Sequence, residues 1–245
     1  MVRNHEATGS IPASSTNITI KHGFDAVFFL LVIVVNKFTI SYNVNVYITI
    51  MKKEDVLKVA EENNGYIYSD LMKEYEIPTV YITRLVKEGS LTKAAKGVYI
   101  AEPGIKDEMY IMSIKYKDIV YSGETALFLN HLSNKQTTTL EVTVPYHKSS
   151  VKIENFNVTR TRKKTFDLGI TMIDTPFGNE VKCYDKERCI CDLFIRPEHY
   201  DYEDRIYAIN EYSKHYLNMK KLYDYAKKLN VYDEVKNVFE VIGWN

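Results

Sequence analysis

Cysteine is scarce in this sequence of 245 residues, which contains three cysteines, and neither sign of charge is in excess. Three cysteines cannot all pair in disulfides, and the spacings of Cys183, Cys189 and Cys191 differ from the C-x-x-C of zinc sites. We therefore expect buried, reduced thiols and a cytoplasmic protein. Lysine plus arginine equals aspartate plus glutamate, at 32 each. Binding to nucleic acid would thus require a local concentration of basic residues.

A long hydrophobic segment is also missing. The longest apolar run, residues 26–35, has ten residues, whereas a transmembrane helix needs about 20. Asp25 precedes this run and no small-residue cleavage site follows it, which disfavours a secretory signal. Met51 followed by two lysines is typical of a translation start. We expect residues 1–50 to be a poorly ordered, dispensable N-terminal extension, and we expect no membrane association.

After this extension, helical and extended patterns follow one another in the order of a winged helix-turn-helix. Helices are predicted over 53–62, from 69 to about 75 and over 79–88, and strands over 66–68, 91–93 and 98–100. Pro78 separates the second helix from the third, because proline forces the preceding residue out of the α region. Gly97 permits a tight turn between the last two strands. The pattern predicts a winged helix over residues 51–102.

The third of these helices carries the candidate DNA-binding face. Ile82, Leu85 and Val86 recur at helical spacing and are predicted to point inward, so the opposite side and the hairpin are left for a ligand. The residues predicted to contact DNA are Thr79, Val80, Thr83, Arg84, Lys87, Thr92, Lys93 and Lys96. We expect the helix to enter the major groove and the hairpin lysines to contact phosphates of double-stranded DNA. Alternatively, the same charges form a solvated face of a protein-binding module.

Residues 103–245 predict a second domain, which makes the fold class α+β. Strands are expected over 138–145, 152–161, 169–174 and 180–184, in an antiparallel sheet, and helices are expected from residue 185 to the C-terminus. A further helix over 123–132 is predicted to begin at Ser122, whose hydroxyl would cap it. His131, near its end, is expected to be a capping or surface residue.

Two charged groups in this domain are candidates for a site. Arg160, Arg162, Lys163 and Lys164 are dense enough to contact an anion or RNA, although basic residues at a strand edge also simply discourage aggregation. Arg188 and Asp192 are four residues apart on a predicted helix, where they can form a structural salt bridge.

Enzyme motifs are largely missing. The sequence has no P-loop, no G-x-G-x-x-G, no G-x-S-x-G and no metal-spaced His/Cys group. Asp174, Glu180 and Lys182 are similar to the two carboxylates and lysine of some metal-dependent nuclease sites. Side-chain alternation along a strand puts Glu180 and Lys182 on one face but does not show that Asp174 lies on that face. We expect no enzyme activity, no cofactor and no bound metal, with a nuclease as a remote alternative.

Five segments taken in order carry a resemblance to a known family. They are R-L-V-K-E-G-S-L-T-K with G-V-Y within residues 84–99, Y-S-G-E-T-A-L at 121–127, V-T-V-P at 142–145, V-T-R-T-R-K-K at 158–164 and D-K-E-R-C-I-C-D-L at 185–193. The chain from residue 51 to residue 245 resembles the AbiEi antitoxins of type IV toxin-antitoxin systems, which act in abortive phage infection. It departs from the pattern in residues 1–50 and at Cys189 and Cys191.

The resemblance implies two activities. The winged helix would repress the operon's own promoter at DNA repeats, and the C-terminal domain would counteract a nucleotidyltransferase-like toxin without a stable complex. A stand-alone repressor with no toxin is the alternative, because both share the winged helix.

Overall fold

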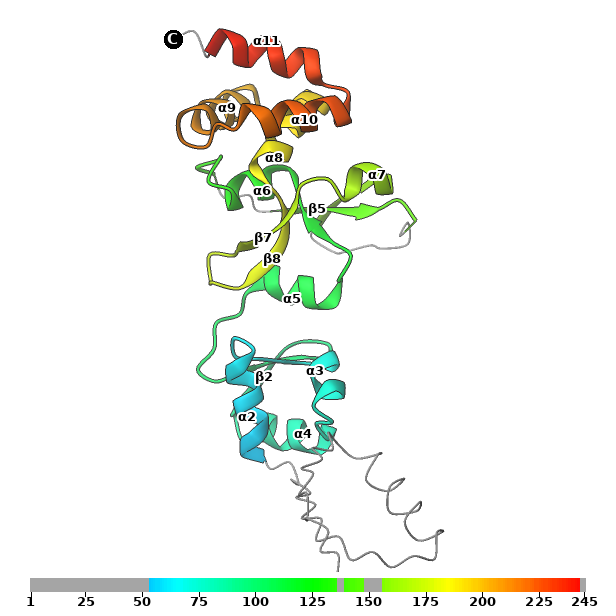
Figure 1. Cartoon of the computed structure of the whole chain (residues 1–245). Helices are drawn as coiled ribbons and strands as arrows, with labels where there is room; N and C mark the ends of the chain where they lie inside the picture. The colour runs from blue at the N-terminus through cyan, green and yellow to red at the C-terminus, as the bar shows by residue number, and fades with distance from the viewer. Residues whose placement is uncertain (1–52, 136–138, 148–155, 243–245) are drawn as a thin grey trace, which may run out of the picture. The chain divides into compact units, whose positions relative to one another are not determined.

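The computed structural model describes residues 53–135, 139–147 and 156–242 (Figure 1). The predicted N-terminal extension, residues 1–50, lies outside the described residues. Every helix within the described ranges is too short or too polar to cross a lipid bilayer.

The first part of the described chain consists of helices and a small antiparallel sheet. Its elements are α2 (Lys53–Glu62), β1 (Tyr66–Tyr68), α3 (Ser69–Glu74), α4 (Thr79–Lys87), β2 (Leu91–Ala95) and β3 (Val98–Ala101). The strands lie in the order β1-β3-β2, and β3 is antiparallel to both neighbours. Val56 and Ala60 of α2, Ile67 of β1, Leu85 of α4 and Leu91 of β2 share one buried core. Each predicted element of this region is present.

The break between α3 and α4 follows from local sequence. Glu76 has φ +50°, Ile77 is buried, and α4 begins directly after Pro78, as predicted. One prediction about α4 is wrong, because Val86 is 37% exposed. Val86 lies at about +40° from Ile82 around the helix while Leu85 lies at about −60°, so Val86 falls on the rim of the buried stripe.

The second part contains a larger sheet followed by helices. Its elements are α5 (Glu108–Lys115), β4 (Val120–Tyr121), α6 (Gly123–Leu129), β5 (Leu140–Pro145), β6 (Phe156–Thr161), α7 (Lys163–Phe166), β7 (Ile170–Asp174), β8 (Glu180–Tyr184), α8 (Lys186–Ile195), the 3₁₀ helix η1 (Pro197–His199), α9 (Tyr202–His215), α10 (Met219–Leu229) and α11 (Tyr232–Ile242). The α+β class is confirmed.

This sheet is mixed, and the prediction of an antiparallel sheet is wrong. Its order is β6-β5-β4-β8-β7. The pairs β4–β5 and β7–β8 are antiparallel, whereas β4–β8 and β5–β6 are parallel. Alternation of side chains between two faces is the same in both arrangements, so the pattern does not encode strand direction.

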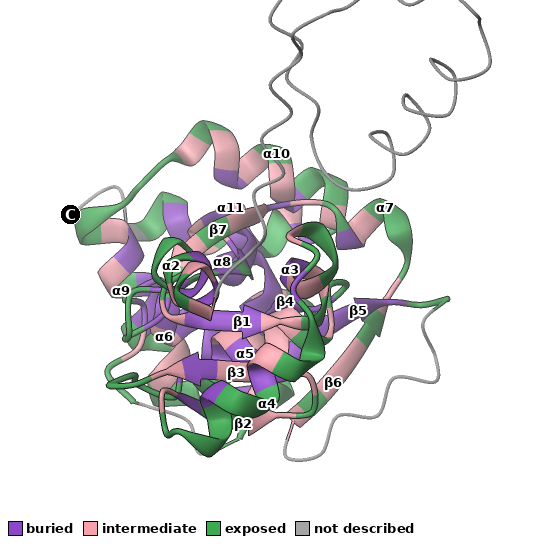
Figure 2. Cartoon of the chain, turned by 90° about the horizontal axis from the view of Figure 1, so that it is seen from below, coloured by how far each residue is buried: buried purple, intermediate pink, exposed green. Residues whose placement is uncertain are grey.

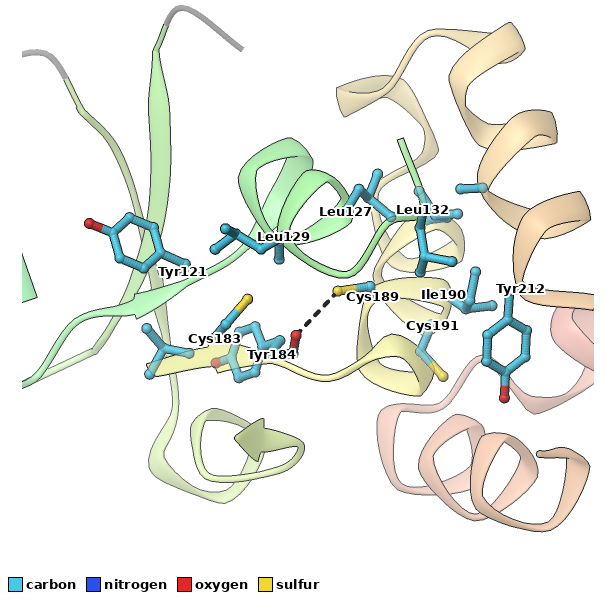
Figure 3. Packing of buried hydrophobic residues seen from close by; sticks show 14 of the residues in the cluster. Tyr121, Leu127, Leu129, Leu132, Cys183, Tyr184, Cys189, Ile190, Cys191 and Tyr212 are labelled. Atoms are coloured by element: carbon cyan, nitrogen blue, oxygen red, sulfur yellow. Dashed lines mark hydrogen bonds between the residues drawn. The ribbon is translucent and has the colours of Figure 1, made fainter. Parts of the chain in front are cut away.

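The main core lies where α6 and α8 pack against this sheet and the C-terminal helices (Figure 3). Seven consecutive residues of α8, from Glu187 to Leu193, are buried. They include Cys189 and Cys191, and Cys183 on β8 is also buried, so the prediction of buried thiols is confirmed. Burial raises the pKa of the Cys189 thiol well above its usual value.

Helix α5 joins the two sheets. Its Ile111 packs with Tyr66, Val98 and Ile100 on the small sheet. The Tyr66 hydroxyl accepts a hydrogen bond from the Asp107 N–H at 3.0 Å, and the buried Asp107 carboxylate accepts one from Asn179 Nδ2 at 2.8 Å. The predicted domain boundary after residue 102 is therefore followed at once by packed contacts.

Candidate nucleic-acid interface

The outward face of α4 presents polar and basic side chains. Thr79, Val80, Thr83, Arg84 and Lys87 are all exposed, and Val80 is exposed to 48%. Ile82 and Leu85 hold the opposite side in the core. The five predicted residues of the helix are therefore all exposed to solvent, and Figure 2 shows exposed segments of α4 in green. The Thr83 hydroxyl donates to the Thr79 carbonyl at 3.0 Å, and its lone pairs can still accept a hydrogen bond.

The two ends of helix α4 are held differently. Pro78 occupies the N-cap position and contributes no side-chain hydrogen bond, but its carbonyl accepts from the Tyr81 N–H at 3.0 Å. At the other end Glu88 forms an ion pair with Lys53 at the start of α2. This pair neutralises the acidic residue that follows Lys87, so the basic character of the face is preserved.

The β2–β3 hairpin exposes polar residues on its first strand and a lysine at its tip. Thr92, Lys93 and Lys96 are exposed, and a bulge interrupts the register between residues 93 and 95. Gly97 has φ +75°, and a Cβ at this position would lie 2.5 Å from Ser69 Oγ. The Ser69 N–H donates to the Gly97 carbonyl at 3.1 Å. This close approach ties the tip to the start of α3.

The second basic cluster lies on β6 and α7. Arg160, Arg162, Lys163 and Lys164 are exposed, as a contact with an anion would require. Arg196, which follows α8, donates from its guanidinium to Thr159 Oγ1 on the same strand at 3.3 Å. Because consecutive strand residues point to opposite faces, this contact lies on the face opposite Arg160, and Arg196 is not part of the cluster.

The three nuclease-like residues come closer together than alternation could predict. Asp174 and Glu180 are directly opposite in the β7–β8 register, and Lys182 lies two residues further on the same face. However, Lys182 Nζ donates to the Lys117 carbonyl at 3.0 Å. Among the described residues no three histidine, cysteine or acidic side chains gather as metal ligands.

The predicted pairing of Arg188 with Asp192 is confirmed. Arg188 Nε donates to Asp192 Oδ1 at 2.9 Å, and both side chains are at least 88% buried. The guanidinium also lies over the Tyr184 ring, 4.2 Å from its centroid, and donates to the Leu168 carbonyl at 3.0 Å. With its donors used inside the protein, Arg188 holds α8 on the sheet and is not available to a ligand.

The capping of α6 differs from the prediction. Ser122 occupies the N-cap position, but its side chain makes no capping bond; instead its hydroxyl accepts from Thr143 Oγ1 at 2.9 Å. Glu141 on β5 replaces it, because its Oε2 accepts from the Glu124 N–H at 2.9 Å. The other Glu141 oxygen lies 3.0 Å from His199 Nε2. His131, after α6, is exposed, as expected of a surface residue.

Comparison with known proteins adds little to this geometry. No known protein family matches the chain, and no curated protein matches it. Among solved structures, the crystal structure of the RV2827C protein from Mycobacterium tuberculosis is similar, with a TM-score of 0.46 and 11% sequence identity. That match covers 73% of this chain and 75% of the other. A likeness at this level carries no argument about fold or function.

Proposed function

We propose that residues 53–101 form a winged helix-turn-helix that binds double-stranded DNA. The observation that carries this proposal is the two-sided nature of α4, with Ile82 and Leu85 buried and Arg84 and Lys87 exposed. The antiparallel order β1-β3-β2 and the exposed tip at Lys96 are what a wing requires. In this arrangement α4 enters the major groove, where Arg84 can reach a guanine edge.

The proposal is tested by measuring affinity for the promoter of the protein's own gene at several salt concentrations. Replacing Lys93 and Lys96 with alanine should reduce the slope of log K against log salt by about 1.8, since each phosphate contact contributes about 0.9. Replacing Arg84 should instead weaken specific binding by about 1–3 kcal/mol, with less effect on nonspecific DNA.

The matched control is Lys214→Ala. Lys214 is an exposed lysine on α9, outside the proposed interface, so this variant removes one positive charge and should bind DNA as the unmodified chain does. If the hairpin variants keep the full salt slope, or if Lys214→Ala weakens binding as much as Arg84→Ala, DNA recognition by this surface is wrong.

We further propose that the chain is a cytoplasmic autorepressor and antitoxin of a type IV system in phage defence. The support is the succession of AbiEi-like segments. In the structure Y-S-G-E-T-A-L spans β4 and α6, and D-K-E-R-C-I-C-D-L leads into and forms most of the buried α8. The partner is a nucleotidyltransferase-like toxin, counteracted without a stable complex. The basic cluster at Arg160–Lys164 is the surface we assign to an anion such as RNA.

Antitoxicity is tested by co-expression with the neighbouring toxin gene. The full chain should restore growth, and the double variant Arg84→Ala/Lys87→Ala should also restore growth while losing promoter repression. The full chain is used because α5 packs on the small sheet, so a cut after residue 102 would expose Ile111. Repression without rescue would instead identify a stand-alone repressor.

A nuclease is retained as a second candidate because Asp174 and Glu180 are paired across the β7–β8 hairpin. It predicts nicking of plasmid DNA that needs magnesium and disappears in Glu180→Ala. Plasmid that stays supercoiled at high protein concentration would eliminate this candidate.

A further inference from the structure

An apolar groove lies between the C-terminal helices. It has a volume of about 530 Å³ and is lined by residues of α8, α9 and α11. Ile209 in the groove is 5% exposed, whereas Ile206 is 41%, Tyr202 73% and Val241 69% exposed. The groove thus has a buried apolar part and an open apolar rim. Its volume falls in the range of about 300–1,000 Å³ that is usual for small-molecule sites.

The groove also contains one cation with an unused donor. Arg205 of α9 lines it, and Arg205 Nε is buried without a hydrogen-bond partner among the described residues. Because this nitrogen is buried in the unliganded groove, the guanidinium must turn for it to reach an acceptor there, and a ligand acceptor would then satisfy a donor that is otherwise left without one. The other polar groups of the lining are the amides of Asn210 and Asn237 and the hydroxyl of Tyr202, which carry no charge.

We propose that this groove binds a small molecule with an apolar body and a single carboxylate, such as a medium-chain fatty acid. The body displaces water from Phe194, Ile206 and Ile209, which are apolar and lie together in the lining. The carboxylate accepts from Arg205, because a guanidinium forms its strongest hydrogen bonds with an anion. No other described residue of the lining is charged, so one acidic group matches the site.

The probes are octanoate and 1-octanol, which share a chain length and differ in the charged group, titrated into the full chain by isothermal titration calorimetry. Octanoate should bind about tenfold more tightly, since a hydrogen bond to a charged group contributes about 1.5 kcal/mol or more. Arg205→Met should reduce octanoate affinity to that of octanol. Equal affinities in the unmodified chain, or octanoate binding unchanged by Arg205→Met, would overturn the proposal.

Two further variants test whether octanoate binding depends on this groove. Lys214→Met removes a cation from the same helix. Lys214 is nine residues from Arg205 and therefore on the opposite side of the helix, so octanoate binding should be unchanged. Val241→Asp adds a negative charge at the rim and should abolish octanoate binding while the melting temperature is retained. The proposal fails if the unmodified chain does not bind octanoate and instead dimerises as its concentration rises. If Val241→Asp then abolishes the dimer, the groove is an interface between copies of this chain.

Discussion

Replacing Gly123 with alanine tests whether the Glu141 carboxylate holds the start of α6. Gly123 has φ +58°, and a Cβ there would lie 1.7 Å from Glu141 Oε2 and 2.9 Å from Glu141 Cδ. The Glu141 side chain is only 9% exposed. Its oxygens contact the Glu124 N–H at 2.9 Å and His199 Nε2 at 3.0 Å. The carboxylate therefore cannot move away without losing at least one of these contacts.

The expected loss has two parts. Left-handed backbone costs alanine about 1 kcal/mol relative to glycine. Displacing the carboxylate loses a hydrogen bond with a charged partner, about 1.5–3 kcal/mol. We expect Gly123→Ala to lower the free energy of unfolding by about 3 kcal/mol in urea, followed by circular dichroism.

Gly178→Ala is the matched control, because Gly178 has φ +80° but nothing lies within 4 Å of the Cβ position. It should lose about 1 kcal/mol, from the backbone conformation alone. If the two variants lower the free energy of unfolding equally, the Glu141 side chain can move aside without cost. The capping role assigned to its carboxylate would then be wrong.

Two other predictions concern charged groups. Burial and the neighbouring Glu141 raise the pKa of Glu124, so folding favours its protonated form and its ionisation lowers stability as pH rises through the folded-state pKa. The stability of Glu124→Gln relative to the unmodified chain should therefore increase between pH 4 and pH 7, measured from urea midpoints. If the difference in stability between the two proteins does not change with pH, the prediction is contradicted. Asp192→Asn leaves the buried Arg188 without its carboxylate and should cost about 3 kcal/mol in the same assay. Asp224→Asn, in an exposed pair, should cost under about 0.5 kcal/mol, and similar losses in both variants would refute the buried-pair argument.

Local features were predictable wherever one stretch of chain contained the cause. Pro78 separates α3 from α4 because a proline constrains its own neighbour. Arg188 meets Asp192 because residues four apart on a helix share a face. The exposed face of α4 follows from the spacing of Ile82 and Leu85. The wrong prediction that Val86 is buried arose because the buried stripe of α4 is narrower than expected.

Features that join distant segments required the tertiary structure. Side-chain alternation is the same for parallel and antiparallel strands, so only the fold decided that β5–β6 is parallel. Glu141 caps α6 from 17 residues away, although Ser122 was the nearer candidate. The register that pairs Asp174 with Glu180 and the groove around Arg205 arise in the same way, from packing between elements that no local pattern connects.

The sequence by itself therefore determined the order of the elements, the polar face of α4 and the helical ion pair, because these depend on interactions within a few residues. Only the tertiary structure decided the strand directions, the carboxylate that caps α6 and the position of Arg205, whose Nε has no partner among the described residues, because each of these depends on which distant segments pack together.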